Sequence, residues 1–434
     1  MNLSEKNFNK LFHVFLCLIA IAMIFRKPCS LLIILFGVFN LIFIRKLKLT
    51  KTAWILILCI ASPVLLELLL FWNNDSFSKG LKAIEKSTSL LLFPIFIIGN
   101  YQRVKFLKLI ETYSIATTMI ILGFAIRFYI IYPDLLSKYL SRIDLFEMGY
   151  KFADSIGMHA PALNMHLAFV SVCAFYFIFY SFQNNEKRML KILRFAVFLL
   201  SFFFVLLVNT RMALVNVLIG FAIVFIIEIK SKFSLNRMAL TLIALLLVIG
   251  GILLFFVQKN PYMKQKYSTV TFAYMDKVGK LDEIDHPEIY AFNTLATRLS
   301  IWKSAWELSI KNLPFGVGAS DGKRELNKYY KETNQQFLAK FEFPTHNQFL
   351  DFLLKFGILG PLVVILYIFT IGYLGYDLKN AVIITFFIIF LTSNLIDDFL
   401  LRFDGIVFSG LWFSVFSSYW LQQKFTLGKE PEVV

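Results

Sequence analysis

The chain has 434 residues, of which 58% are hydrophobic and 17% aromatic, and its mean hydropathy is +0.69. These values exclude an ordinary soluble globular domain and indicate an all-α polytopic membrane protein. A net charge of +16 would suggest a nucleic-acid partner for a soluble protein. Here most Lys and Arg stand in short segments beside apolar runs, where they set topology, so we expect no nucleic-acid partner.

Apolar runs recur along the chain and predict about twelve transmembrane helices. The runs are centred near residues 11–25, 30–44, 52–72, 88–99, 107–131, 161–182, 192–208, 212–228, 238–257, 358–376, 380–396 and 405–421. The first run follows Lys6 and Lys10, as in a signal peptide, but no small-residue cleavage site follows it. We therefore expect it to be an uncleaved first transmembrane helix.

These runs predict an N-terminal transmembrane bundle at 1–257, a large loop with helices at 258–345, C-terminal transmembrane helices at 346–421 and a tail at 422–434. If the N-terminus is cytoplasmic, the inner connections carry roughly twice as many Lys and Arg as the short outer connections, as the positive-inside rule requires. We therefore expect both termini in the cytoplasm and the large loop on the outer side of the membrane.

The large loop contains a helix-like segment at 294–312 and a glycine-rich breaker, PFGVGASDG, at 314–322. The breaker is neither a Walker nor a Rossmann fingerprint, because it lacks the GK[ST] ending and follows no strand. It is instead typical of a turn that allows close backbone approach. A contact between its N–H groups and an anionic substrate is a second interpretation.

After the loop, the segment FPTHNQFLDFLLKFGILGP at 343–361 predicts a helix start, with Thr345 as N-cap and Gln348 completing a capping box. His346 and Asn347 then fall in the first helical turn. The helix dipole there disfavours a charged imidazole, and a neutral imidazole can act as a base. The alternative is that His346 only caps the helix or packs.

The rest of this helix places Asp351 and Lys355 at i,i+4 beside a broad apolar face, which predicts a helix lying at the membrane surface.

Three arginines are expected on the outer side. Arg211 interrupts an apolar hairpin, Arg298 stands on the loop helix, and Arg402 follows the acidic pair Asp397 and Asp398. Arginine binds phosphate through a planar fork, so these residues are candidates for a diphosphate site. Snorkelling or a structural ion pair is the alternative for each, with Asp398 at i,i+4 as the partner of Arg402.

His159 and His166 stand at the start of the run at 161–182. Pro161 suits a first helical turn, which points His159 to the outer side and His166 deeper into the bilayer. No carboxylate shares this spacing. We expect no metal site and no cofactor.

The segments TRMALVNVL (210–218), TRLSIWKSAWELSIKNLPFGVGAS (297–320) and THNQFLDFLLKFGILGP (345–361) together resemble the O-antigen ligase and polymerase superfamily. The shared signature is an arginine at a helix start, R-x-x-x-W followed by P-x-G-x-G, and then HN-x-x-L. The resemblance implies a GT-C-like, inverting, metal-independent glycosyltransferase of the bacterial inner membrane. Such an enzyme takes a glycan from undecaprenyl diphosphate on the periplasmic face.

Residue by residue, the resemblance implies that Arg211 and Arg298 bind the diphosphate and that His346 is the base for the acceptor hydroxyl. It also implies an acidic residue after the penultimate helix, which is either Asp397 or Asp398. A methionine follows Arg211 where the family usually has a small residue. The expected supporting positions are His159, Asn347 and Arg402.

The function we expect is that of an O-antigen ligase, which joins the glycan to the lipid A-core of lipopolysaccharide. A polymerase that joins lipid-linked repeat units is the first alternative. Transfer to a protein and transport of a lipid-linked glycan are two further alternatives. Donor, acceptor and surrounding lipid would then be the partners of the protein.

Overall fold

The computed structural model describes residues 3–134, 137, 146–229, 251, 272–292 and 294–426. No strand occurs among these residues, which confirms the all-α class. Long apolar runs adopt helices because a helix pairs its own backbone groups where water cannot do so. The run predicted at 238–257 lies, apart from residue 251, outside the described residues.

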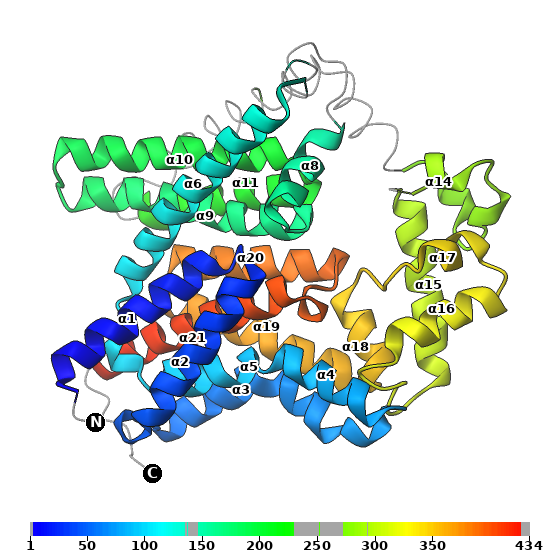
Figure 1. Cartoon of the computed structure of the whole chain (residues 1–434), viewed down its shortest axis with the longest axis horizontal. Coiled ribbons are helices and arrows are strands. Elements are labelled where there is room, and N and C mark those ends of the chain that lie inside the picture. The colour runs from blue at the N-terminus through cyan, green and yellow to red at the C-terminus, as the bar shows by residue number, and fades with distance from the viewer. Residues whose placement is uncertain are drawn as a thin grey trace.

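Each of the other predicted runs is helical (Figure 1). These helices are α1 (Glu5–Ala22), α2 (Arg26–Ile42), α3 (Lys51–Leu69), α5 (Ser89–Phe93) with the π-helical turn Pro94–Ile98, α6 (Phe106–Ile131), α9 (Ala160–Gln183), α10 (Arg188–Val208), α11 (Arg211–Ile229), α19 (Leu359–Leu378), α20 (Ala381–Ile396) and α21 (Phe403–Thr426). The shorter helices are α4 (Phe77–Ser87), α8 (Phe146–Ile156), α14 (Pro287–Tyr290), α15 (Leu295–Lys311), α16 (Gly322–Glu332), α17 (Gln336–Phe341) and α18 (Gln348–Phe356).

Six of the described helices are long and apolar enough to cross a membrane on their own, namely α3, α6, α9, α10, α11 and α19. Two further apolar helices, Ser89–Ile98 and Ala381–Ile396, are shorter. The protein is therefore a multi-pass membrane protein by length and composition. The count of about twelve crossings and the GT-C-like architecture stay predictions.

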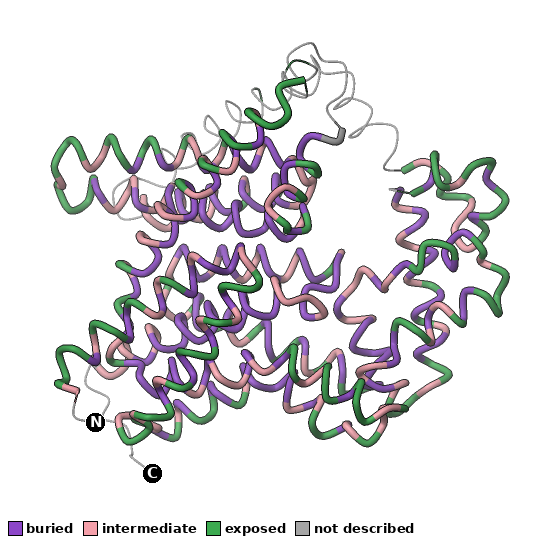
Figure 2. The backbone as a smooth tube through the Cα atoms, in the orientation of Figure 1, coloured by how far each residue is buried: buried purple, intermediate pink, exposed green. Residues whose placement is uncertain are grey.

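The long helices pack in layers around one continuous hydrophobic core. Helix α9 packs against α10, α11 and α6, and α20 joins this layer to α19 and then to α3 (Figure 1). The burial pattern in Figure 2 follows this arrangement, with buried residues where the layers meet and exposed residues on the outer faces. A wide apolar surface on the outside suits a lipid environment.

The start of α1 and the end of α21 lie at one end of the bundle (Figure 1). At the start of α1, Glu5 pairs with Lys46 at 2.6 Å and with Arg103 at 2.5 Å. At the end of α21, the Gln422 side chain donates to the Val104 carbonyl at 2.8 Å. The segment 101–104 therefore contacts the first and the last helix. Which side of a membrane the termini occupy stays a prediction.

The helices α14 to α17 project from the opposite end of the bundle and have a small hydrophobic core of their own. Tyr330, Phe337 and Phe343 belong to this core, and so does Leu354 of α18. Helix α18 also packs on α19. It is therefore the element that joins the projecting helices to the membrane bundle.

The glycine-rich breaker makes the close backbone approach that its sequence predicts. The N–H groups of Val317 and Gly318 donate to the carbonyls of Leu354 and Lys355, at 2.9 and 3.0 Å. A Cβ atom on Gly357 would lie 1.7 Å from a backbone oxygen of this breaker, so only glycine fits. Because these two N–H groups cap the end of α18, they are not available to an anionic substrate.

Candidate functional site

The start of α18 differs from its prediction. Asn347, and not Thr345, is the N-cap, and its side-chain oxygen accepts from the N–H groups of Phe349 and Leu350 at 3.0 and 3.1 Å. The helix begins at Gln348. An asparagine caps as well as a threonine, so the sequence did not distinguish between the two positions.

The side chains expected to form a capping box instead fasten this segment to the connection between α20 and α21. The Thr345 hydroxyl donates to Asp398 at 3.4 Å, and the Gln348 side-chain oxygen accepts from the Leu400 N–H at 2.7 Å. His346 lies before the helix with a left-handed backbone, φ +46°. The prediction that it occupies the first helical turn is therefore wrong, and the helix dipole does not set its charge.

The imidazole of His346 is held in place but remains accessible. The Trp302 indole N–H donates to the His346 carbonyl at 3.3 Å, and the Asn347 amide donates to the Leu395 carbonyl at 3.0 Å. The His346 side chain is 22% exposed. A substrate can therefore reach a ring whose backbone is fixed on both sides.

Asp397 is the carboxylate that orients this ring. Its Oδ1 lies 3.3 Å from His346 Nδ1 and also accepts from the Asp398 N–H at 2.9 Å. When Nδ1 donates its hydrogen to this oxygen, Nε2 carries the lone pair and can accept a proton. The sequence left open whether Asp397 or Asp398 pairs with the histidine, and the geometry selects Asp397.

The two neighbouring carboxyl groups differ in ionisation. Burial opposes the ionisation of Asp397, but the hydrogen bond with His346 and the charge of Arg402 outweigh it, and its pKa is lowered. Burial and the charge of Asp397 raise the pKa of Asp398, which is fully buried. Arg402 Nη2 lies 3.9 Å from an oxygen of each. Of the two carboxyl groups, Asp397 is therefore the one that ionises more readily.

Arg298 reaches this cluster from α15. Its Nη1 donates to the Ile396 carbonyl, one residue before Asp397. Burial lowers the pKa of Arg298, while the charge of Asp397 raises it and the like charge of Arg211 lowers it. A guanidinium stays protonated in proteins, so Arg298 keeps its positive charge. It lies within electrostatic reach of the negative charge of Asp397 and the positive charge of Arg211.

Arg211 is the first residue of α11, as its hairpin position predicts. Asn209 ends α10 in a left-handed conformation, φ 56°, which is tolerated by asparagine. The Asn164 amide of α9 donates to the Thr210 hydroxyl at 2.9 Å. The tight turn is thus tied to a neighbouring helix, which fixes where the Arg211 side chain begins.

Two further residues of the site come from the connection before α9. Burial raises the pKa of Tyr150 in α8, and the charges of Arg298, Arg211 and Asp397 also influence this pKa. Burial lowers the pKa of His159, the N-cap residue of α9, and the charges of Arg402, Asp397 and His346 also influence this pKa. His159 was expected at the site. Tyr150 was not, because no motif or spacing marks it in the sequence.

His166 does not join the site. It is fully buried in α9, where its Nδ1 lies 3.4 Å from the Tyr113 hydroxyl and its ring packs on Phe408. Its depth in the bilayer relative to His159 stays a prediction.

Among the described residues, His346, Asp397 and Asp398 offer ligand atoms within 4.8 Å of one another, a group that could hold a metal ion. The sequence spacing did not reveal this group, since His346 and the two aspartates are far apart in the chain. The Arg402 guanidinium lies 3.9 Å from both carboxylates, and a bound cation would have to overcome its repulsion. The pKa of Asp398 is raised by burial and by the charge of Asp397, so this carboxyl group would have to give up its proton more readily than it does here to bind a metal.

The residues predicted for the site from distant parts of the chain thus meet at one end of the bundle, where α18 adjoins the projecting helices. Residues 195–365 match a family model described as O-antigen ligase. The matched range includes Arg211, Arg298 and His346, and it ends before the acidic pair. No curated protein sequence matches the chain.

Proposed function

We propose, from the premise that this chain carries a domain of the O-antigen ligase and polymerase superfamily over residues 195–365, that it is an O-antigen ligase. In this proposal it moves a glycan from undecaprenyl diphosphate to the lipid A-core of lipopolysaccharide, at the periplasmic face of the inner membrane. The observation that carries the proposal is the contact between His346 Nδ1 and Asp397 Oδ1, 3.3 Å long, beside three arginines.

His346 is the general base in this proposal. A sugar hydroxyl is a poor nucleophile until a base takes its proton, and a well-placed base contributes about 10²- to 10⁴-fold. Asp397 fixes the ring and stabilises the imidazolium that forms when Nε2 takes the proton. Asp397 is thus a positioning residue that acts through His346.

Arg298 and Arg211 bind the diphosphate of the donor. The acceptor oxygen forms a bond to the anomeric carbon while the bond from that carbon to the diphosphate oxygen breaks, and a single displacement of this kind inverts the configuration. Negative charge grows on the departing diphosphate, and guanidinium groups in fixed positions stabilise it. The reaction in this form needs no metal ion.

The distribution of basic residues supports an orientation for this site. The connections at the end of the bundle that carries both termini are the richer in Lys and Arg, and the positive-inside rule assigns that end to the cytoplasm. The site at the opposite end then faces the periplasm, where no nucleotide sugar is available. The energy for transfer must therefore come with the donor.

The experiment that tests the proposal supplies the purified protein with an undecaprenyl-diphosphate glycan and a choice of acceptors, and identifies the product. A ligase forms a glycan joined to lipid A-core, whereas a polymerase forms a longer lipid-linked glycan. Deletion of the gene gives a second readout. Loss of a ligase leaves long polymer on undecaprenyl diphosphate, and single repeat units on lipid A-core in the deletion strain would overturn the assignment.

A further inference from the structure

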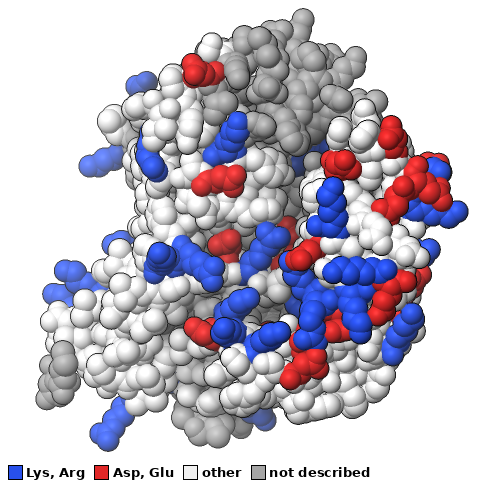
Figure 3. Space-filling view, turned by 45° about the vertical axis from the view of Figure 1, so that its right-hand side comes forward, with Lys and Arg blue, Asp and Glu red and all other residues white. Residues whose placement is uncertain are grey.

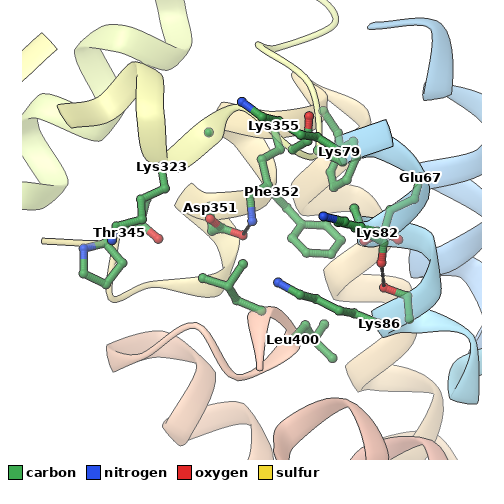
Figure 4. A pocket seen from close by; sticks show the side chains of 18 of the residues that line it. Glu67, Lys79, Lys82, Lys86, Lys323, Thr345, Asp351, Phe352, Lys355 and Leu400 are labelled. Carbon is green, nitrogen blue, oxygen red and sulfur yellow. Dashed lines mark hydrogen bonds and ion pairs between the residues drawn. The ribbon is translucent and has the colours of Figure 1, made fainter. Parts of the chain in front are cut away.

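A cavity of about 350 Å³ is lined in part by Thr345, whose hydroxyl donates to Asp398 (Figure 4). Its walls come from α3, α4, α16, α18 and the start of α21. The glycine-rich breaker contacts the segment just before α4 here. The Asn73 amide donates to the Gly316 carbonyl at 3.0 Å, and Asp321 accepts from the Asp75 N–H at 3.0 Å. None of the three arginines of the site, and neither His346 nor Asp397, lines this cavity.

Basic side chains dominate the polar lining of the cavity. Lys79, Lys82 and Lys86 stand at i, i+3 and i+7 of α4, so they share one helix face. In Figure 4 Lys82 and Lys86 reach from α4 towards Asp351 and Leu400. Figure 3, which brings the side of the projecting helices forward, shows Lys and Arg side chains gathered around a hollow.

The acidic side chains of the lining do not neutralise these lysines. Asp351 is held by Lys355 at 2.6 Å, and both are almost fully buried. The prediction that their helix, α18, lies at the membrane surface stays a prediction. Lys323 pairs with Glu342 at 3.0 Å. In the described part of the chain, no acidic side chain forms an ion pair with Lys79, Lys82 or Lys86.

Glu67 is the remaining carboxyl group in the lining. Its side chain hydrogen-bonds to Ser87, as the dashed line in Figure 4 shows. Three unpaired lysines therefore face one carboxyl group. The three lysine side chains are exposed, so water partly screens their charges, and Phe352, Leu326 and Leu400 add apolar surface to the lining. This combination favours an anion with several oxygen acceptors, such as a phosphate group.

The position of the cavity indicates which substrate would carry the anion. Thr345 and Leu400 line it, and Thr345 is the neighbour of His346 in the chain. A ligand in the cavity is thus next to the base but separate from the arginines assigned to the donor diphosphate. A molecule whose hydroxyl group meets His346 can place a second, anionic group in the cavity.

From these observations we propose that the cavity lined by Lys79, Lys82 and Lys86 binds a phosphate group of the acceptor, and so selects phosphorylated acceptors. This proposal rests on the proposed function, because it takes His346 as the base for the acceptor. It extends that function by naming a recognition site separate from the diphosphate site.

The test compares two variants in which three lysines become glutamine. The first changes Lys79, Lys82 and Lys86, and glutamine keeps their helix propensity. The control changes Lys280, Lys303 and Lys331, which are also exposed and do not line the cavity; Lys303 and Lys331 lie on α15 and α16, and Lys280 lies in the segment before α14. A third variant replaces the cavity lysines by arginine and so keeps their charge.

Each protein is reconstituted in phosphatidylcholine vesicles with the lipid-linked donor. It is assayed with a phosphorylated glycolipid acceptor and with the same acceptor after phosphatase treatment. We expect the glutamine variant of the cavity to raise KM for the phosphorylated acceptor about tenfold, the effect of losing three partly screened charge contacts. KM for the treated acceptor, and kcat for both, should match the wild type, and the arginine variant should restore KM.

An equal defect on both acceptors, or a defect shared with the control, would overturn the proposal. A phospholipid headgroup is the other source of phosphate. The assay is repeated with phosphatidylglycerol added to the vesicles. If the difference in KM between the variants depends on this lipid and not on the acceptor phosphate, the acceptor assignment fails.

Binding of the phosphorylated glycolipid without donor is measured in parallel. This readout separates the two proposals, because absence of transfer by the wild type defeats the proposed function and leaves the binding result intact. A roughly tenfold loss of affinity confined to the cavity variant supports the site, and unchanged affinity overturns it.

Discussion

Replacing Asp397 or Asp398 by asparagine should separate two neighbouring carboxyl groups that sequence alone leaves equivalent. Asp397 is the ionised member, whose Oδ1 lies 3.3 Å from His346 Nδ1. In Asp397→Asn the charge is lost and the amide can turn its NH₂ towards the ring, which favours the wrong tautomer. A hydrogen bond to a charged group contributes about 1.5–3 kcal/mol, so kcat should fall by about 10- to 100-fold.

Asp398 is the member whose pKa is raised, and asparagine has the shape and hydrogen-bonding groups of a protonated carboxyl group. The Asp398→Asn variant should therefore keep kcat within about threefold of the wild type, which corresponds to less than 1 kcal/mol. It is a matched control, since the same substitution is made one residue away. Donor KM should be nearly unchanged in both variants, because neither carboxyl group is assigned to the diphosphate.

The assay is turnover of lipid-linked donor by purified protein, with kcat and KM measured separately across pH. Equal activity of the two variants would refute the division of charge between the two groups. A larger defect in Asp398→Asn than in Asp397→Asn would refute the assignment of Asp397 to His346.

The other predictions concern the arginines, metal ions and stability. Arg298→Lys keeps the charge but loses the planar fork, so donor KM should rise about tenfold or more, while Arg324→Lys on the exposed face of α16 should have no effect. If the Arg298 and Arg211 lysine variants both match the wild type, these residues do not bind the diphosphate. Activity should persist in excess EDTA, and a loss that divalent ions restore would assign the His346, Asp397 and Asp398 group to a metal. Because the folded pKa of Asp398 is raised above the unfolded value of about 4, its contribution to stability is present below that pH and is lost as pH rises through the folded pKa. Thermal unfolding should thus show a loss of stability above about pH 4 that is smaller in Asp398→Asn, and identical pH profiles would contradict this.

Much of the fold and the site could be predicted from the sequence because both depend on strong local signals. Apolar runs longer than a bilayer crossing have few alternatives to a helix, and each described run is helical. The glycine-rich breaker at 314–322 predicted a close approach of two backbones, which the structure confirms, and the breaker meets Gly357 there. The arginines were found because charge beside an apolar run is costly unless it has a partner or a function.

Other features depend on contacts between distant segments and leave no local signal. Thr345 and Asn347 are both good caps, and only the bond from Thr345 to Asp398 decides that Asn347 takes the role. Tyr150 enters the site through the packing of α8 on α9 and α10. The helical spacing of Asp351 and Lys355 predicted their ion pair, but it does not reveal that the pair is buried or that the Lys355 side chain lies against Gly322 of α16.

The central claim, that His346 takes the proton of the acceptor hydroxyl, is tested most directly by comparing donor binding and turnover in His346→Ala. The imidazole is assigned to the acceptor and the arginines to the donor. The variant should therefore bind the undecaprenyl-diphosphate glycan as the wild type does, while turnover falls by about 10²- to 10⁴-fold, the usual contribution of a general base. Near-normal turnover with intact binding would contradict the assignment of His346 as the base.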